Sequence, residues 1–173
     1  MKHKVVTTLS PTGVQQMIDS VQEYREWLKT GCTLLLERLA QEGYEVASAG
    51  FSDATYDGTN DVTVSVEDRG KIKAVVAVGG TVLFIEFGTG ITYPDNHPEA
   101  SDLGMVRGTY GNGHGKQTTW GYYGDPGTNG TVAGERAKGT LVLTHGTPAN
   151  MPMYNAVKEL ELRLGTLVKE VFR

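Results

Sequence analysis

The sequence has little of what several classes of protein require. It contains one cysteine, Cys32, so it can build neither an intrachain disulfide framework nor a cysteine-based zinc site. No apolar run approaches the roughly 18 residues of a membrane span, and too few apolar residues follow Met1-Lys2-His3-Lys4 for a signal peptide. We therefore expect a chain that is made in the cytoplasm and has no membrane partner.

Blocks of basic residues are also missing. The 16 Lys and Arg residues are spread among 20 Asp and Glu residues, and the formal net charge is -4. A module that binds nucleic acid by following its phosphates needs a concentrated positive surface, so the sequence disfavours that class. A ring through whose bore DNA passes without specific binding remains compatible with this charge.

What the sequence does contain fits one domain over residues 1–173. The length is ordinary for a domain, and 39% hydrophobic with 21% charged residues is close to the globular average. Glycine is the exception, because its 23 residues are densest between positions 104 and 139. We therefore expect a packed core together with one glycine-rich surface segment.

Residues 10–43 are predicted to be helical. Ser10 is a suitable N-cap, Pro11 suits the first helical position, and Gly43 is a natural stop. Thr30-Gly31 could divide the segment into two helices. Apolar residues recur at spacings of three, four and seven and form one stripe: Val14, Ile18, Val21, Leu28, Cys32, Leu35 and Leu39. A thiol in such a stripe is expected to be buried, inert packing.

The rest of the chain is predicted as a meander, a flap, a return strand and a final helix. Residues 61–87 combine alternating valines with two turn signals, which predicts three strands, the last of them at 81–87. Residues 91–139 are expected to form a long glycine-rich flap, and residues 140–145 a return strand. Residues 151–172 carry a helical apolar stripe. A long N-terminal helix and a C-terminal helix on one small, mostly antiparallel sheet make an α+β fold.

No catalytic, cofactor-binding or metal-binding residues are predicted. His97, His114 and His145 lie in or beside loops, without the i, i+4 spacing of a helical metal site. Glu86 lies in an apolar run and has no carboxylate or histidine locally paired with it, which favours an interface or turn-capping role over catalysis. The aspartates near Gly58 are predicted to be solvated turn material: Asp53, Asp57 and Asp61.

Two separated stretches together resemble a known family. The first is Phe84-Ile85-Glu86-Phe87-Gly88-Thr89-Gly90, followed by His97-Pro98-Glu99-Ala100 and by Gly-Asn-Gly-His-Gly at 111–115. The second runs from Gly146 to Ala156 and includes Pro-Met-Tyr-Asn-Ala. This pair resembles the phage neck or tail-completion family, which comprises small minor tail proteins encoded between capsid and tail-tube genes. The resemblance covers about residues 80–160 and also fits the expected order of elements.

The resemblance implies a structural virion protein that works by binding and is not an enzyme. Members of that family form rings that close the junction between the head connector and the tail tube. The expected partners are therefore other copies in a six-fold ring, the tail tube or tail terminator protein, and the head connector or head closure protein. The expected location is the neck or tail of the virion, after synthesis in the cytoplasm of the bacterial host. The residues predicted for these interfaces are Glu86, Phe87, Gly88, Thr89, Tyr110, Trp120, Tyr122 and Tyr123.

Other functions stay open at the level of sequence. One is a metal-dependent hydrolase that uses His97, His114 and His145 together with Glu86. Another is a binding module that holds a small ligand under the flap. In a tail-only contractile particle, a subunit with the same signature would instead terminate the tail. Residue spacing supports neither the hydrolase nor the ligand-binding module.

Overall fold

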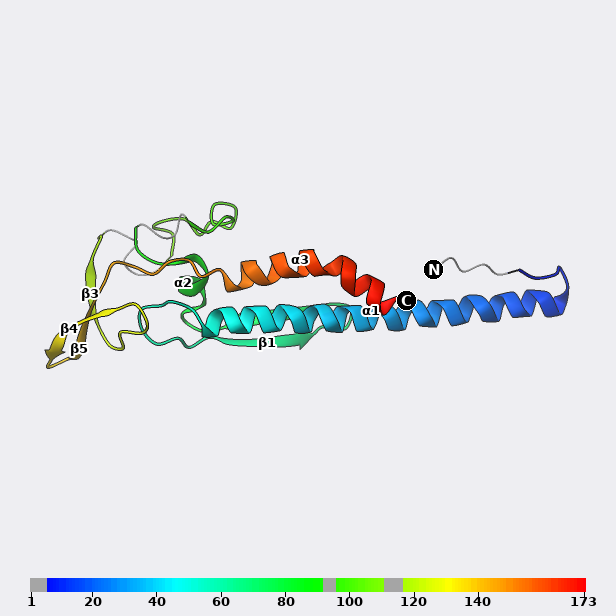
Figure 1. Ribbon diagram of the computed structural model, residues 1–173, viewed down its shortest axis with the longest axis horizontal. Helices are drawn as coiled ribbons and strands as arrows, with labels where there is room; N and C mark the ends of the chain where they lie inside the picture. The colour runs from blue at the N-terminus through cyan, green and yellow to red at the C-terminus, as the bar shows by residue number, and fades with distance from the viewer. Residues whose placement is uncertain (1–5, 92–95, 111–116) are drawn as a thin grey trace.

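A computed structural model describes residues 6–91, 96–110 and 117–173 and shows a molecule much longer than it is wide (Figure 1). Helix α1 runs along most of its length, and a small sheet occupies one end. The predicted α+β class is confirmed. The elements in chain order are α1 (Pro11–Ser52), β1 (Thr63–Asp68), β2 (Lys73–Val78), α2 (Val82–Phe87), β3 (Trp120–Tyr123), β4 (Thr131–Arg136), β5 (Gly139–Thr144) and α3 (Pro152–Val171).

Helix α1 begins where the sequence predicts and ends later. The backbone of Ser10 is extended and its hydroxyl accepts a hydrogen bond from the Gly13 amide at 3.1 Å, so it is a true N-cap before Pro11. Gly43 does not stop the helix, and the prediction of an end there is wrong. A Cβ at Gly43 would lie 3.1 Å from Leu160 Cδ1 and 3.3 Å from Val75 Cγ2. Glycine at this position therefore permits the close approach of α3 and β2 to α1.

The prediction that Thr30-Gly31 could split the helix is also wrong, for a similar reason. A Cβ at Gly31 would overlap the ring of Phe172, just beyond the end of α3. Gly31 therefore seats the end of the C-terminal helix on an uninterrupted α1. Cys32, the next residue, is exposed and not buried as predicted. It lies one helical position off the line that packs on α3.

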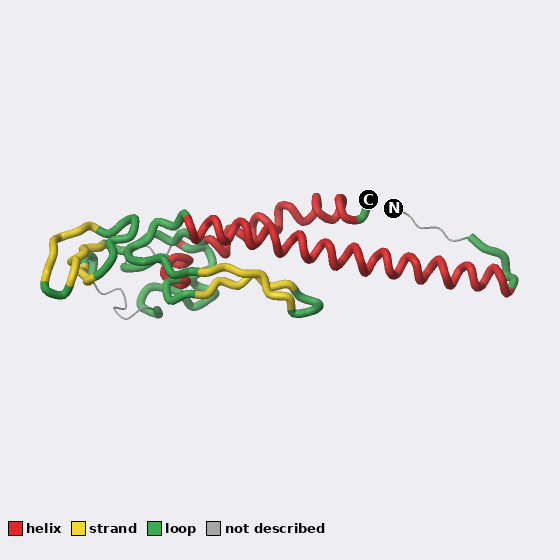
Figure 2. Tube along the Cα trace, turned by 90° about the horizontal axis from the view of Figure 1, so that it is seen from below, coloured by secondary structure: helices red, strands yellow, loops and turns green. Residues whose placement is uncertain are grey.

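Helix α3 lies antiparallel along the second half of α1, while the β1–β2 hairpin lies along another side (Figure 2). Small residues on α1 allow this close packing, since a Cβ at Gly50 would lie 2.8 Å from Pro152 Cβ. Ion pairs join the helices between Arg38 and Glu170 at 3.1 Å and between Glu42 and Arg163 at 3.0 Å. Exposed pairs of this kind contribute at most about 1 kcal/mol each, so the apolar and glycine contacts dominate the packing.

The strands form two separate antiparallel sheets and not the single sheet predicted. Strands β1 and β2 pair as a hairpin, with Val64 opposite Ala77 and Val66 opposite Val75. The predicted return strand is confirmed as β5, but it lies at the centre of a second sheet ordered β3-β5-β4. It does not extend the hairpin.

The third strand of the predicted meander is instead the short helix α2. A short apolar run such as Val82–Phe87 fits a strand or a buried helix equally well by its period. The Asp61 carboxylate sets the start of this helix, because it accepts hydrogen bonds from the amides of Gly80 at 2.8 Å and Thr81 at 3.0 Å and from the Thr81 hydroxyl at 2.5 Å. Asp61 is therefore a specific acceptor and not merely solvated turn material.

The predicted flap contains two strands that sequence reasoning missed. Strands β3 and β4 flank β5, and a register shift between Val132 and Gly134 marks a bulge in β4. Gly124, Gly134 and Gly139 adopt positive φ values of 155°, 138° and 112° at the turns and the bulge of this sheet. The glycines therefore shape a folded sheet, and the prediction of a plain surface loop over 91–139 is wrong for this part.

A small buried cluster lies beside α2, between the C-terminal end of α1 and the N-terminal end of α3. Phe51, Ala54 and Ile85 form its centre, with relative exposures of 2%, 7% and 0%. Valines of the hairpin and Met153 of α3 pack against it. This cluster fixes α2 against both long helices. Over the described ranges, no helix combines the length and apolar character needed to cross a bilayer.

The Asp61 contacts predict a pH-dependent contribution to stability. Hydrogen bonds from Thr81 and Gly80 lower the pKa of Asp61 below its ordinary value. The ionised carboxylate therefore stabilises the fold fully at pH values above the ordinary pKa. This stabilisation is lost as the pH falls through the lowered pKa. We expect Asp61→Asn to unfold at lower urea than the wild type at pH 7, with the difference vanishing under strongly acidic conditions. Asp102→Asn, in an exposed turn, is the control. A constant difference at all pH values would contradict the assignment.

Candidate functional site

The two stretches that carry the family resemblance meet in the structure. The Thr89 amide donates to the Thr147 carbonyl at 2.9 Å, and the Thr147 amide donates to the Thr89 hydroxyl at 2.8 Å. The Asn150 amide donates to the Ile85 carbonyl at 2.9 Å. We call residues 84–90 and 146–156 together the motif junction. Segments about 60 residues apart in the chain thus form one hydrogen-bonded unit.

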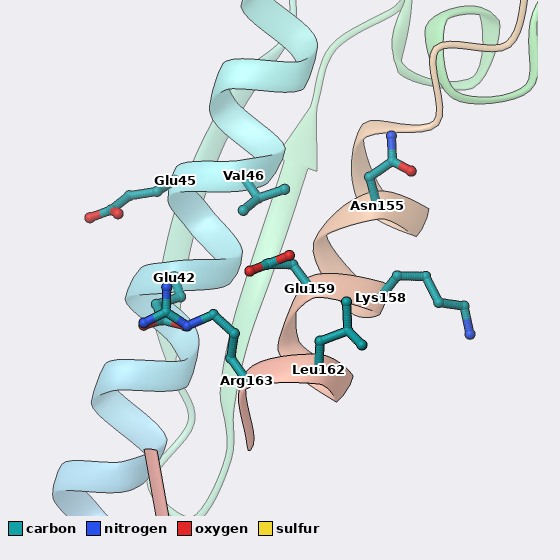
Figure 3. A pocket seen from close by; sticks show the side chains of 8 residues that line it. All are labelled: Glu42, Glu45, Val46, Asn155, Lys158, Glu159, Leu162 and Arg163. Carbon is teal, nitrogen blue, oxygen red and sulfur yellow. The ribbon is translucent and has the colours of Figure 1, made fainter. Parts of the chain in front are cut away.

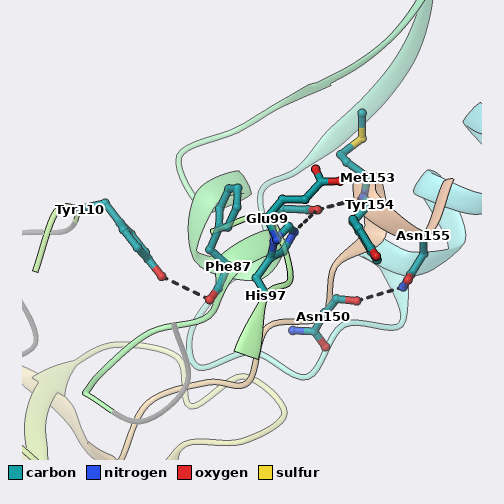
Figure 4. A network of polar contacts seen from close by, with 9 residues as sticks. Phe87, His97, Glu99, Tyr110, Asn150, Met153, Tyr154 and Asn155 are labelled. Carbon is teal, nitrogen blue, oxygen red and sulfur yellow. Dashed lines mark hydrogen bonds and ion pairs between the residues drawn. The ribbon is translucent and has the colours of Figure 1, made fainter. Parts of the chain in front are cut away.

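The Glu86 carboxylate is the centre of the motif junction, and its partners His97, Met153 and Tyr154 are labelled in Figure 4. Glu86 is 5% exposed, and its Oε2 and Oε1 accept hydrogen bonds from the amides of Met153 at 2.9 Å and Tyr154 at 3.0 Å. These amides belong to the first turn of α3, where four N–H groups have no partner within the helix. The N-cap residue Met151, at a φ of 57°, provides no side-chain cap. Glu86 therefore supplies the cap from a different helix, and its negative charge suits the helix N-terminus.

His97 completes the shell around this carboxylate. Its Nδ1 accepts a hydrogen bond from the Glu99 amide at 3.1 Å, which assigns the ring proton to Nε2 in the neutral tautomer. Nε2 lies 3.2 Å from Glu86 Oε1 and donates to it. The ring also packs on Phe87, with centroids 4.4 Å apart, and on Tyr154 at 5.3 Å. The Glu99 amide thus fixes the orientation of the ring through Nδ1, and Nε2 holds Glu86.

Gly88 and Tyr110 close the other side of the motif junction. Gly88 has φ 82° and ψ −178°, a conformation available essentially to glycine alone. A Cβ there would lie 2.7 Å from the Thr147 carbonyl oxygen and 2.8 Å from the Ala149 nitrogen. The Tyr110 hydroxyl donates to the Gly88 carbonyl at 2.6 Å. Close packing at Gly88 and the hydrogen bonds of Glu86 therefore account for two residues of the Glu-Phe-Gly-Thr-Gly motif.

These contacts change the interpretation of most of the predicted interface residues. Glu86, Phe87 and Gly88 are buried within the single chain and offer little surface to a partner there, so their role at an interface stays a prediction. The physical reason is that the chain needs them to cap and seat α3. Thr89 and Tyr110 are partly buried in the same unit. The contacts of Glu86 are those of a cap, one of the two roles that the sequence indicated for it.

The three remaining predicted residues lie on β3 and divide between its two faces. Trp120 and Tyr122 are half-buried on the face of the sheet that packs against the rest of the molecule. A Cβ at Gly90 would lie 3.2 Å from the Trp120 ring. Tyr123 is 48% exposed on the opposite face, opposite Leu141 and diagonal to Leu143, which is 40% exposed. The outer face of the β3-β5-β4 sheet is therefore open and apolar. We call Tyr123, Leu141 and Leu143 the outer sheet face.

Asp57 ties this sheet to the loop after α1, a role that sequence analysis missed. Its carboxylate accepts hydrogen bonds from Asn129 Nδ2 at 2.8 Å and from the Thr144 hydroxyl. Burial raises the pKa of Asp57, and the Asn129 hydrogen bond and the charge of His145 partly offset that rise. Burial and the neighbouring Asp57 carboxylate raise the pKa of Tyr122 to about 12. An Asp-Gly pair alone signals a turn, so only the distant Asn129 and Thr144 reveal this tether.

The histidines proposed for a metal site do not gather in the part of the chain that the structure describes. His97 is buried beside Glu86, whereas His145 is exposed and its Nδ1 contacts the Thr119 hydroxyl at 2.8 Å. His114 lies outside the described residues. Within residues 6–91, 96–110 and 117–173, no three His, Cys, Asp or Glu side chains are grouped so as to hold a metal ion.

A groove of about 410 Å³ lies between α1 and α3 and meets the motif junction only at Asn155 (Figure 3). Its lining carries both signs of charge, with Arg163 directed toward Glu42 and Lys158 extending away from α1. One oxygen of the Glu42 side chain, Oε2, is buried and makes no hydrogen bond to the described residues. The groove is open and mixed in charge, which fits a helix–helix furrow better than an enclosed, largely apolar ligand site.

The cap predicts a graded loss of stability. We expect Glu86→Ala to lower the free energy of unfolding by roughly 3 kcal/mol, because two helix amides and the His97 N–H lose their acceptor. Glu86→Gln keeps one acceptor oxygen and should lose about half as much. Glu99→Ala, an exposed glutamate beside the same histidine, should change stability by about 0.5 kcal/mol or less. Urea denaturation followed by circular dichroism measures all three, and equal losses for Glu86→Ala and Glu99→Ala would contradict the cap.

Gly88 provides an independent test of the motif junction. Gly88→Ala should destabilise the protein by roughly 3 kcal/mol or more, because the new methyl group meets backbone atoms that cannot move aside. Gly104→Ala is the matched control, since its φ of 70° is also positive but a Cβ there meets nothing within 4 Å. It should lose about 1 kcal/mol. Thermal unfolding of both variants decides the matter, and similar melting temperatures would mean that the close contact is unimportant.

Comparison of the chain with protein-family models, with curated proteins and with solved structures gave no match.

Proposed function

We propose that the chain is a structural subunit of a tailed phage or a phage-derived particle. It forms a ring at the neck, or top of the tail, that completes the tail and joins it to the head connector. Its partners are other copies of itself in a six-fold ring, the tail tube or terminator protein, and the head connector or closure protein. Its work is binding, and DNA passes through the bore without specific contacts.

The motif junction is the observation that carries this proposal. The resemblance to the tail-completion family rests on two stretches that are weak signals when taken separately. In this chain they contact one another through Glu86, Gly88 and Thr89, so they act as one structural unit. If the two short matches were due to chance, there would be no reason to expect them to contact one another. The junction therefore supports treating the two stretches as one signature.

The exposed surfaces also support a role in assembly. The outer sheet face presents Tyr123 and Leu143, and aromatic residues on an open surface are typical of contacts with partners. Strands β3 and β4 are the edges of their sheet and carry unpaired backbone groups that a neighbour can meet. In a ring, each subunit uses two different surfaces, so a contact of modest area repeats around the axis. Tyr123 is thus the predicted interface residue best placed to meet a partner.

The proposal predicts a defect in particle assembly. Deletion of the gene from the phage or prophage that encodes it should yield filled heads beside unjoined or abnormally ended tails in negative-stain electron microscopy. Complementation with the wild-type gene should restore joined particles. The double variant Tyr123→Ser with Leu143→Ser should fail to complement, because it removes the apolar outer sheet face without entering the core.

Val157→Ser is the matched control for this experiment, because Val157 is an equally exposed aliphatic residue on α3 at 50%. It should restore joined particles like the wild type. Normal infectious particles after deletion of the gene would refute the proposed function itself. Full complementation by the double variant would refute only the role of the outer sheet face.

A further inference from the structure

The outer sheet face shares its side of the β3-β5-β4 sheet with two glycines. Residues that lie opposite one another in an antiparallel ladder point to the same side, so the register gives the rows across this side in the order β3, β5, β4. The first row is Gly121, Leu143 and Thr131, and the second is Tyr123, Leu141 and Gly134. In each row, a glycine on one edge strand is matched by a larger residue on the other edge strand.

The two leucines lean toward β3. A Cβ at Gly121 would lie 3.2 Å from Leu141 Cδ1 and 3.4 Å from Leu143 Cδ2, so both side chains extend over that glycine. A Cβ at Gly134, on the opposite edge, would meet nothing within 4 Å. The apolar side chains therefore form a ridge over β3 and β5, while the surface at Gly134 is low and open. We call the open surface at Gly134 the β4 trough.

A ridge beside a trough makes this side of the sheet complementary to itself. A two-fold axis that runs along β5, between two facing sheets, places the β3 edge of one copy over the β4 edge of the other. Tyr123 of each copy then lies over the β4 trough of the other copy, and Thr131 lies over Gly121. Leu141 and Leu143 meet their own counterparts at the axis. Facing sheets pack about 10 Å apart with nearly aligned strands, which is the arrangement that this axis gives.

We infer that the outer sheet face is the docking site for a second copy of this chain, with the two sheets face to face across this two-fold axis. The same contact forms twice in the pair, as a two-fold interface requires. The inference concerns the free chain and does not rest on the proposed function. A partner in the particle that uses the same face must displace the second copy, so the pair is a state of the chain before assembly.

The charges on this side of the sheet permit the pairing. Arg136 lies opposite Gly139, two residues beyond the row of Gly134, and therefore belongs to the same side. The two-fold axis keeps the two copies of Arg136 at opposite edges of the contact. Each arginine approaches the β3 edge of the other copy, where the Tyr123 ring offers a face that attracts cations. The contact thus brings an arginine to an aromatic ring and not to another arginine.

The area of the contact predicts a weak pair. Tyr123 is 48% exposed and Leu143 is 40% exposed, while Thr131 and Arg136 are also exposed. With large side chains offering on the order of 75–100 Å² each, this side of the sheet supplies roughly 400 Å² per copy and about 800 Å² per pair. Stable specific interfaces begin at about 1,200 Å², and smaller ones belong to transient complexes. We therefore expect a dimer that dissociates on dilution in the micromolar range.

The test compares two substitutions that each add one carboxylate to this sheet in the full-length protein. Leu143→Glu places it at the two-fold axis, where it meets the same carboxylate of the second copy. Val132→Glu is the matched control, because Val132 is 54% exposed and pairs with Val142 on the other side of the sheet. In sedimentation velocity, the wild type and Val132→Glu should pass from the mass of one chain to that of two as concentration rises. Leu143→Glu should raise the dissociation constant about tenfold or more.

A second uncharged variant covers the case in which Leu143→Glu loses structure, which circular dichroism reveals. Tyr123→Ser removes the ring from the β4 trough of the second copy and changes a residue that is already 48% exposed. It should weaken association in the same experiment, since aromatic side chains seated in a partner's hollow carry much of the affinity of an interface.

A charge-swap experiment tests the two-fold arrangement itself. Position 143 meets position 143 of the other copy only if this axis relates them. Leu143→Glu and Leu143→Lys should therefore be monomeric alone and should associate when mixed in equal amounts. A wild type that stays monomeric, equal dissociation constants for Leu143→Glu and Val132→Glu, or a mixture that stays monomeric would each overturn the inference. Gene deletion tests the proposed function separately, so either can fail without the other.

Discussion

The hydrogen bonds from the first turn of α3 to the Glu86 carboxylate hold the centre of this molecule together. A buried carboxylate is tolerated only where donors replace water, and here two helix amides and one imidazole N–H do so. The same contacts relieve α3 of unpaired amides that its own N-cap residue, Met151, leaves without a side-chain partner. Helix α2, the loop that bears His97 and the start of α3 are thereby fixed in one arrangement. Helix α3 then packs along α1, and β5 leads into it from the distal sheet.

This rigid centre separates two ends that expose apolar surface. At one end, the outer sheet face carries Tyr123 and Leu143, and at the other the first half of α1 projects without a partner helix among the described residues. We propose that the outer sheet face serves contacts within the assembled particle.

Sequence periodicity was sufficient for the long and regular elements and insufficient where distant contacts decide. The apolar stripes of α1 and α3 and the alternating valines of β1 could be interpreted locally, because each element has one face toward its neighbours. Gly43 could not be interpreted locally, since only the approach of Leu160 and Val75 shows that it is a packing site and not a helix end.

The run 82–87 was ambiguous until the structure showed that Asp61 anchors its first turn. Strands β3 and β4 were hidden because both are short, contain a glycine and show little apolar alternation. The sequence indicated a capping role for Glu86 but not its partners, because Met153 and Tyr154 lie 67 and 68 residues away in the chain.

The central claim is that the two signature stretches form one unit through the Glu86 cap. Amides in the first turn of a helix ordinarily exchange with solvent quickly, because they lack partners and the end frays. Native-state hydrogen exchange, measured by NMR at the amides of Met153 and Tyr154, therefore tests the claim most directly. We expect both amides to be protected as strongly as amides in the middle of α3. Exchange at the rate of an exposed helix end would contradict it.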